Sequence, residues 1–249
     1  MSHPDAPQAA QRQLAVRNRP AGPCVMYQRW RRLAFLHWSF APEEIAPTLP
    51  AGLSLDTFDG HAWVGIVPFA MEGVRPRWSC ALPLLSRFPE INLRTYVIGP
   101  DGTPGVWFYS LDASRLLAVL VARLRFQLPY YWAEMKETPE EDGFIYYESR
   151  RWRRQESQCF RYRAQGPLYE AKPGSLEFFL IERYALFARR RNGRIRKGLV
   201  HHPPYTIQAA ELALFDDGLF EFARLPRPGR EPDHVLYSPG VDVEIFGIE

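Results

Sequence analysis

The segment 88–97 carries an acid, an amide, a guanidinium and a phenol at every second position, supplied by Glu90, Asn92, Arg94 and Tyr96. Side chains two residues apart on a β-strand share a face, so we expect these groups to form one row. Arginine binds a carboxylate through two parallel hydrogen bonds, and a glutamate buried beside it can act as an acid or a base. The row predicts that Arg94, Asn92 and Tyr96 bind an anionic ligand and that Glu90 is catalytic. The structural alternative is a half-exposed strand whose polar face meets water.

Two further residues join this predicted site. Tyr130 lies in an aromatic segment, 128–135, and we expect its hydroxyl to donate a hydrogen bond to the ligand oxygen that gains negative charge. Core packing is the alternative for this tyrosine. Arg75 follows a predicted strand in a proline-stiffened loop, 73–77, where it either lines the rim of the site or meets solvent. The prediction therefore has Glu90 and Tyr130 as catalytic residues and, as ligand-binding residues, Arg94, Asn92, Arg75 and Tyr96.

The sequence lacks the motifs that bind common cofactors or metals. It contains no Gly-x-Gly-x-x-Gly run, no P-loop, no His-Glu-x-x-His and no Gly-x-Ser-x-Gly, which argues against nucleotide cofactors, zinc peptidases and α/β-hydrolases. The three cysteines are widely spaced and odd in number, so we expect reduced, mostly buried thiols with no disulfide and no structural zinc. Adjacent histidines at 201 and 202 face opposite ways on a strand. We predict neither a cofactor nor a bound metal ion.

The composition is typical of a soluble globular protein. Of the 249 residues, 46% are hydrophobic and 24% are charged, so the chain can bury a sizeable core. No apolar run approaches the roughly 20 residues that span a bilayer, and the N-terminus lacks the pattern of a signal peptide. These features predict a cytoplasmic protein that does not enter a membrane.

Turn signals and apolar patterning predict the elements. Residues 1–23 show no apolar period and are expected to form a disordered tail, whereas 24–249 contains no linker and is predicted to be a single domain. Helices are predicted at 112–126 and from 175 to about 187, with a short helical turn after Pro42. An Asn-Gly hairpin turn is predicted at 192–193, and strands are expected at 61–69, 90–97, 105–109, 128–135, 143–151, 158–163 and 205–214. Many strands with two packed helices predict an α+β fold built on a curved antiparallel sheet or barrel.

Two basic clusters, 150–154 and 189–197, suggest nucleic acid as an alternative partner, with Trp152 as a stacking surface. The net charge of +3 is nearly balanced, whereas nucleic-acid-binding proteins are usually far more basic. The second cluster also lies at a hairpin turn, where charged residues are common. A nucleic-acid partner is therefore the least favoured function.

Several motifs together resemble those of the YqjF-like family, a bacterial group of unknown function. They extend from about Tyr27 to Phe246 and include Phe-Leu-His-Trp at 35–38, Trp-Val-Gly-Ile-Val-Pro-Phe at 63–69, Phe-Pro-Glu-Ile-Asn-Leu-Arg-Thr-Tyr-Val at 88–97, Leu-Pro-Tyr-Tyr at 128–131 and Glu-Arg-Tyr at 182–184. The family is similar to the acetoacetate-decarboxylase-like superfamily. This resemblance implies a cone-shaped antiparallel β-barrel with flanking helices and a central cavity, which agrees with the α+β prediction.

The resemblance also bears on the chemistry. In the decarboxylases, a lysine of a Pro-Lys-Lys motif forms a Schiff base with a β-keto acid, and the corresponding segment here is Pro-Tyr-Tyr at 129–131. The three lysines of this chain offer no substitute. Lys136 lies between two glutamates that favour its protonated form, Lys172 precedes a Pro-Gly turn, and Lys197 lies in the basic hairpin. We predict no Schiff-base decarboxylation. Glu90 matches a pocket glutamate of the superfamily, which implies an acid–base role.

Together these features predict a barrel cavity for a small, anionic carboxylate or keto acid. One reading is an enzyme that catalyses a lyase, hydratase or isomerase step. The alternative is a non-catalytic module that binds or senses the same ligand, and the sequence leaves both open. The predicted partner is a small molecule and not a membrane, and assembly into a homo-oligomer also stays open.

Overall fold

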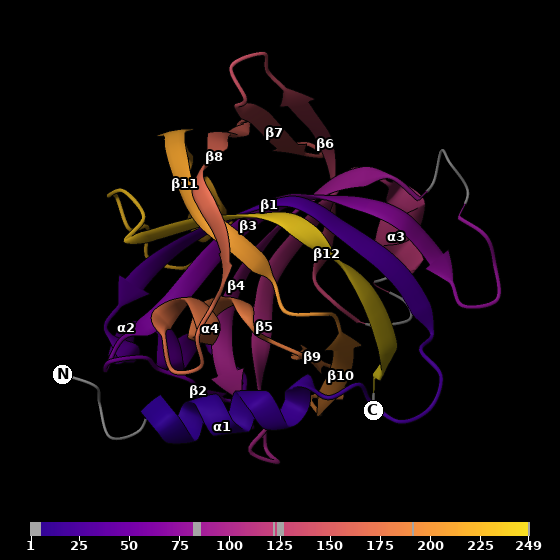
Figure 1. Ribbon diagram of the computed structural model, residues 1–249, viewed down its shortest axis with the longest axis vertical. Helices are drawn as coiled ribbons and strands as arrows, with labels where there is room; N and C mark the ends of the chain where they lie inside the picture. The colour runs from indigo at the N-terminus through magenta and orange to yellow at the C-terminus, as the bar shows by residue number, and fades with distance from the viewer. Residues whose placement is uncertain (1–5, 82–85, 122, 124–126, 191, 249) are drawn as a thin grey trace.

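The computed structural model describes residues 6–81, 86–121, 123, 127–190 and 192–248. Its strands form one 12-stranded sheet, flanked by short helices (Figure 1). No helix in these ranges has both the length and the hydropathy to cross a bilayer. The strands are β1 (Met26–Phe40), β2 (Ser54–Leu55), β3 (Ala62–Pro76), β4 (Phe88–Ile98), β5 (Pro104–Ala113), β6 (Tyr130–Pro139), β7 (Ile145–Arg151), β8 (Gln158–Glu170), β9 (Ala185–Arg189), β10 (Ile195–His201), β11 (Thr206–Leu214) and β12 (His234–Ile248). The helices are α1 (Ala6–Arg17), α2 (Pro42–Ile45), the 3₁₀ turn η1 (Ala46–Thr48), α3 (Leu116–Val121), α4 (Leu176–Ile181) and α5 (Gly218–Phe222).

The sheet closes on itself twice. Its strand order is β10-β9-β5-β6-β7-β8-β11-β12-β1-β3-β4-β2, and two additional pairings join β4 to β5 and β10 to β12. One closed ring therefore contains β1, β3, β4, β5, β9, β10 and β12, and we call it the hollow ring. A second ring contains β1, β3, β4, β5, β6, β7, β8, β11 and β12, and we call it the filled ring. The shared strands form the wall between the two interiors.

Side chains on the shared strands alternate between these interiors. On β1, Leu33 and Phe35 belong to the apolar cluster of the hollow ring, whereas Ala34 and Leu36 belong to that of the filled ring. The filled ring is packed with fully buried aromatic side chains from β7, β8 and α5, which are Tyr147, Phe160, Tyr162 and Phe220. Both faces of the shared wall are consequently buried.

The structure confirms the α+β class and a barrel-like sheet with flanking helices. Every strand that the sequence predicts is present, as are the helical turn after Pro42 and the β9–β10 hairpin, although residue 191 of its turn lies outside the described residues. Two pairings, β5 with β6 and β5 with β9, are parallel, so the sheet is not wholly antiparallel. At Gly105 of β5, an added Cβ would lie 2.7 Å from the Ala185 carbonyl oxygen, so only glycine allows this close approach of β9.

The first predicted long helix begins later than expected, and the second ends earlier than expected. Residues 112 and 113 continue β5, because the Asp112 carboxylate accepts a hydrogen bond from Arg151 Nε at 2.7 Å instead of capping a helix. Only α3 follows, and residues 122 and 124–126 lie outside the described residues. Ser175 does cap α4, accepting a hydrogen bond from the Phe178 N–H at 3.2 Å. The helix ends at Ile181, and the apolar residues that follow enter β9 instead.

Part of the segment 1–23, which the sequence predicts to be a disordered tail, is helical in the structure. Residues 6–17 form α1, whose Gln13 is 2% exposed and donates hydrogen bonds to the carbonyl oxygens of Phe178, Phe179 and Glu182. The helix thereby satisfies carbonyl groups at the C-terminal end of α4. Figure 1 shows α1 crossing one end of the sheet. A contact of this kind leaves no apolar period in the sequence, which explains why the helix was not predicted.

Candidate active site

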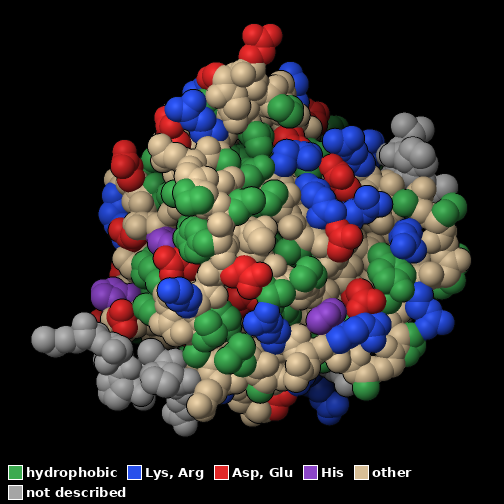
Figure 2. Space-filling model, in the orientation of Figure 1, with side chains coloured by type: hydrophobic (Ala, Val, Ile, Leu, Met, Phe, Trp, Pro, Cys, Tyr) green, Lys and Arg blue, Asp and Glu red, His purple; other side chains and the backbone are tan. Residues whose placement is uncertain are grey.

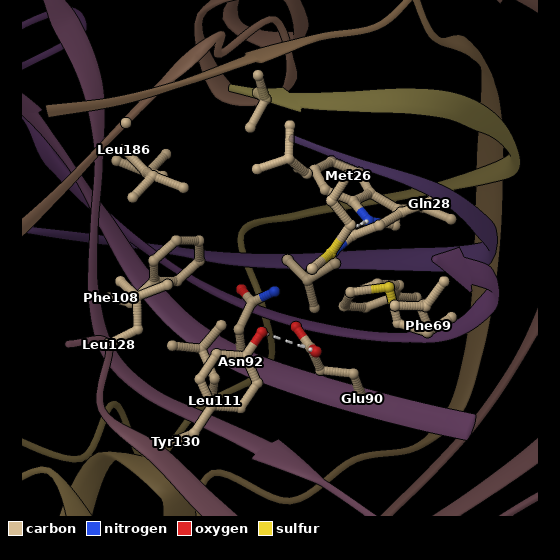
Figure 3. A pocket seen from close by; sticks show the side chains of 18 of the residues that line it. Met26, Gln28, Phe69, Glu90, Asn92, Phe108, Leu111, Leu128, Tyr130 and Leu186 are labelled. Atoms are coloured by element: carbon tan, nitrogen blue, oxygen red, sulfur yellow. Dashed lines mark hydrogen bonds between the residues drawn. The ribbon is translucent and has the colours of Figure 1, made fainter. Parts of the chain in front are cut away.

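The hollow ring encloses a cavity of about 420 Å³ (Figure 3). All seven of its strands contribute lining side chains, and β6 adds Tyr130. Most of the lining is apolar. The polar side chains include Glu90, Asn92 and Arg94 on β4, together with Arg183 from the segment after α4. The polar face of β4 is therefore turned toward this partly open cavity, and not toward the outer surface of the sheet.

Glu90 is the buried acid of this cavity. Its side chain is 2% exposed, and its Oε2 accepts a hydrogen bond from the Tyr130 hydroxyl at 3.0 Å. Burial raises the pKa of Glu90 to about 8; the hydrogen bond from Tyr130 opposes this shift and the negative charge of Asp112 adds to it. Most Glu90 side chains are consequently protonated at neutral pH, and the group can both release and accept a proton near that pH.

Tyr130 and Asn92 lie beside this acid. Burial and the proximity of Glu90 raise the pKa of Tyr130 well above its ordinary value, so its hydroxyl stays a hydrogen-bond donor. The Asn92 side chain is 5% exposed, and its Oδ1 has no hydrogen-bond partner. Figure 3 shows both side chains and Glu90 pointing into the same part of the cavity. An orphaned buried amide oxygen beside an acid is a place where a ligand can supply the missing partner.

Arg94 brings a positive charge that no acid neutralises. Its Nη2 donates a hydrogen bond to the Leu180 carbonyl oxygen at 3.2 Å, while its buried Nε has no partner. Its guanidinium carbon lies 5.6 Å from the ring centroid of Phe35. Within the part of the chain that the structure describes, no carboxylate forms an ion pair with Arg94. The free N–H and the unbalanced charge suit a ligand carboxylate.

A second guanidinium lines the cavity, and sequence reasoning assigned it no role. Arg183 is 5% exposed, donates through Nη1 to Asp56 at 2.6 Å and through Nε to the Phe179 carbonyl oxygen at 2.7 Å. Its buried Nη2 has no hydrogen-bond partner. The Glu-Arg-Tyr motif at 182–184 was the available signal. The orientation of Arg183 follows from the end of α4, which residue spacing does not reveal.

Two residues of the predicted site lie away from the cavity wall. The Tyr96 hydroxyl forms a hydrogen bond with His37 Nε2 at 2.8 Å, and burial lowers the pKa of this histidine well below its ordinary value. The guanidinium carbon of Arg75 lies 4.4 Å from the ring centroid of Tyr27 on the neighbouring strand. The structure therefore brings together Glu90, Asn92, Arg94 and Tyr130, but neither Tyr96 nor Arg75.

None of the three lysines lines the cavity. Lys197 Nζ donates to Asp101 at 2.5 Å in the β9–β10 region, and Lys172 is exposed in the turn before α4. In the Pro-Tyr-Tyr segment, Tyr130 points to Glu90, whereas the ring of Tyr131 lies 4.2 Å from the guanidinium carbon of Arg151. No lysine amine is placed to attack a carbonyl group in this cavity.

Three arginines of the first basic cluster have partners within the protein. In the first cluster, Arg150 pairs with Glu134, and Arg151 pairs with the buried Asp112. Arg154 lies over the Phe222 ring, with 5.1 Å between the guanidinium carbon and the centroid. Figure 2 shows acidic side chains interspersed among basic ones on the face of the molecule that it displays.

The three cysteines lie in different parts of the structure. Cys24 is buried and Cys159 is partly buried, in line with the prediction that most thiols are buried. Cys80 differs, because it is exposed at the edge of the cavity. Among the described residues no group of three or more His, Cys, Asp or Glu side chains is placed to hold a metal ion. The cavity-lining groups with a shifted pKa or an unpartnered polar atom include Glu90, Asn92, Arg94, Tyr130 and Arg183.

Comparison with known sequences identifies relatives over most of the chain. The profile of the DUF2071 family, described as an uncharacterized conserved protein, matches residues 27–242. An uncharacterized protein from Bacillus subtilis, YqjF, is 35% identical over 213 residues, which cover 86% of this chain and 87% of that protein.

Solved structures share the fold at low identity. The enduracididine biosynthesis enzyme MppR, complexed with pyruvate, superposes with a TM-score of 0.60 at 12% identity and covers 92% of this chain and 90% of its own. Acetoacetate decarboxylase from Legionella pneumophila gives 0.60 at 13% identity over 92% and 89% of the two chains. An acetoacetate-decarboxylase-like enzyme from Sphingomonas wittichii RW1 gives 0.60 at 14% identity over 91% and 93%. The predicted acetoacetate-decarboxylase-like fold is confirmed.

Proposed function

The chain belongs to the DUF2071, or YqjF-like, family, and from that premise we propose that its cavity binds an oxo acid and moves a proton at the carbon beside the carbonyl group. The observation that carries the proposal is a buried acid, Glu90, with a pKa of about 8 in the same cavity as the uncompensated charge of Arg94. Proton transfer of this kind is the step that lyases, hydratases and isomerases of oxo acids share.

Each group has a defined part in this step. Arg94 binds the ligand carboxylate, and the ionised form of Glu90 takes a proton from the adjacent carbon. The electron pair of the broken C–H bond becomes the C=C bond of an enolate, and the carbonyl oxygen gains the negative charge. The Asn92 amide N–H donates a hydrogen bond to that oxygen. The Tyr130 hydroxyl donates to Glu90 in the structure, and its single O–H turns to the enolate oxygen once Glu90 has taken the proton. Return of the proton from Glu90 regenerates the oxo acid and the carboxylate.

The pKa of Glu90 suits such a role. A general base works best when its pKa lies near the working pH, because it is then both available and strong enough. With a pKa of about 8, roughly one Glu90 in ten is ionised at pH 7. We therefore expect the rate of proton transfer to rise with pH and to level off above about pH 8.

Imine chemistry is not part of the proposal, because no lysine lines the cavity. The structural neighbour MppR was solved with pyruvate, which is an oxo acid, and this supports an oxo acid as the ligand class. Tyr130 occupies the segment where the decarboxylases carry their lysine, so the cavity retains an acid–base group and lacks a nucleophilic amine.

The test is exchange of the C3 hydrogens of 2-oxobutyrate in deuterium oxide, followed by proton NMR. We expect exchange with the native protein, loss of exchange in Glu90→Gln with binding retained, and native exchange in Glu134→Gln, whose side chain forms an exposed ion pair with Arg150. Borohydride trapping of the same acid is expected to label no lysine. Exchange that persists in Glu90→Gln, or a trapped lysine adduct, contradicts the proposal.

A non-catalytic binding module is the second candidate, favoured by the absence of a lysine from the cavity lining. The same measurements separate the two functions. Calorimetric binding of 2-oxobutyrate, abolished in Arg94→Gln, without any deuterium exchange in the native protein establishes a binding module. Binding accompanied by exchange establishes an enzyme.

A further inference from the structure

The cavity is much larger than a three-carbon acid requires. Its volume is about 420 Å³. Pyruvate has six non-hydrogen atoms, so it would leave more than half of this space to solvent. Cavities of roughly 300–1,000 Å³ are typical of sites for larger organic ligands.

The additional space has apolar walls. Polar side chains lie on β4 and beside it, and Gln28, Ser79 and Arg115 also line the cavity. Most of the remaining lining from the other strands of the hollow ring is aliphatic or aromatic. Leu186 on β9 and Phe108 on β5 line one side in Figure 3, and Met26 on β1 and Phe69 on β3 line the other. Ordered water needs two to four polar partners, which such walls do not offer.

The charges place the acid group of the ligand at one pole of the cavity. The guanidinium carbons of Arg94 and Arg183 lie 5.7 Å and 5.0 Å from the ring centroid of Tyr96, so both flank one aromatic ring. Each guanidinium has a buried N–H without a hydrogen-bond partner, namely Nε of Arg94 and Nη2 of Arg183. Asp56 balances one of the two charges, so one net positive charge is left for a carboxylate.

We propose that the ligand is an amphipathic oxo acid, with its carboxylate at Arg94 and Arg183 and an apolar body of several carbons against the walls formed by Leu186 and Phe108. This inference rests on the proposed binding of an oxo acid and adds the class of that acid. Its basis is the juxtaposition of a charged pole with an apolar cavity too large for a short acid.

Affinity across a series of straight-chain 2-oxo acids from three to twelve carbons tests this inference. Titration calorimetry with the native protein is expected to give about fourfold tighter binding for each added methylene, which corresponds to about 0.8 kcal/mol per buried CH₂. The gain stops once the chain exceeds the cavity. Affinity that does not change with chain length overturns the inference.

Substitutions at the apolar wall give the test a spatial control. Leu186→Trp fills part of the cavity and is expected to move the best chain length toward shorter acids, whereas Phe108→Ala enlarges it and moves the optimum toward longer ones. Leu214→Trp places the same bulk on the exposed strand β11, where the side chain is 41% exposed, and is expected to leave the optimum unchanged.

The outcomes distinguish this inference from the proposed function. If no acid binds at any length, the proposed function fails. If short and long acids bind equally, or if both wall variants keep the native optimum, the proposed function stands and the amphipathic ligand is excluded. Where Leu186→Trp does not fold, the opposite shift expected for Phe108→Ala decides the question, since that substitution only removes atoms.

Discussion

The hollow and the filled ring share the wall formed by β1, β3, β4, β5 and β12, yet their interiors differ in kind. In the filled ring, buried phenols donate to backbone carbonyl groups: Tyr162 to Arg32 at 3.1 Å and Tyr147 to Phe69 at 3.4 Å. In the hollow ring, buried polar atoms of Asn92, Arg94 and Arg183 have no partner. Buried polar atoms without a partner also occur on strands of the filled ring, such as Ser149 Oγ on β7 and Gln158 Oε1 on β8. The difference is that Asn92, Arg94 and Arg183 line a cavity that a ligand can enter.

Adjacent residues of β4 show the difference between the two interiors. Glu90 and Asn92 point into the hollow ring, while Ile91 and Leu93 are fully buried in the filled ring. Burying an unpaired polar group destabilises the folded state. The apolar side chains on the opposite face of β4 offset this destabilisation. The site is thus positioned by the same strand whose opposite face stabilises the sheet.

The largest expected effect on stability comes from placing a polar side chain on the face of β4 that is buried in the filled ring. Ile91→Asn removes a buried aliphatic side chain and leaves an amide without partners in the filled ring, so we expect unfolding to become easier by about 5 kcal/mol. The neighbouring change Asn92→Leu removes an orphaned polar atom and is expected to keep or raise stability while weakening acid binding. Chemical denaturation measures both. Equal destabilisation by the two variants would show that the rings do not differ.

Removing one aromatic side chain from each ring compares how much the two interiors contribute to the free energy of unfolding. Phe160→Ala empties a fully buried position in the filled ring and is expected to cost about 3–5 kcal/mol of unfolding free energy. Phe108→Ala borders an existing cavity, so fewer contacts are lost and we expect a cost of about 1–2 kcal/mol. Urea denaturation of each variant provides the comparison. A larger loss for Phe108→Ala than for Phe160→Ala would contradict it.

The sequence predicts which residues face each ring only where the two faces of a strand differ in polarity. The alternation at 88–97 predicts both β4 and its polar row, because the side-chain period of a strand is two residues. It does not reveal that both faces are buried. The run 33–36 in β1 is apolar throughout for that reason, so it shows no alternation, and neither β1 nor β12 was predicted.

The site residues divide in the same way. Glu90, Asn92 and Arg94 follow from strand geometry, whereas Arg183 reaches the cavity through the end of α4 and its contact with Asp56, 127 positions away in the chain. Tyr96 has the correct spacing but finds His37 within hydrogen-bonding distance. Contacts between distant segments decided both outcomes, and the size of the cavity likewise depends on strands that close the ring.

The titration of Glu90 sharpens the comparison through pH. Because the folded state raises its pKa from 4.5 to about 8, the folded protein retains the proton over a range where the unfolded chain has lost it. Stability therefore falls as pH rises from about 5 to 8, and Glu90→Gln removes this dependence. We expect the stability difference between native protein and variant to change by about 2–4 kcal/mol over that range. Denaturation curves at several pH values measure it, and a constant difference would contradict a buried, protonated Glu90.

The smallest effect comes from the hydroxyl that touches this acid. The Tyr130 hydrogen bond favours the carboxylate form, so Tyr130→Phe is expected to move the Glu90 midpoint above pH 8 by about one unit, since a hydrogen bond to a charged group contributes roughly 1.5–3 kcal/mol. The carboxyl ¹³C shift of Glu90 reports this midpoint without reference to turnover. Tyr109→Phe is the matched control, because its hydroxyl bonds to Thr48 beside the filled ring and leaves Glu90 untouched. If both variants keep the native titration midpoint of Glu90, the Tyr130 hydroxyl does not affect the pKa of Glu90. Stabilisation of the enolate oxygen then depends on Asn92 alone.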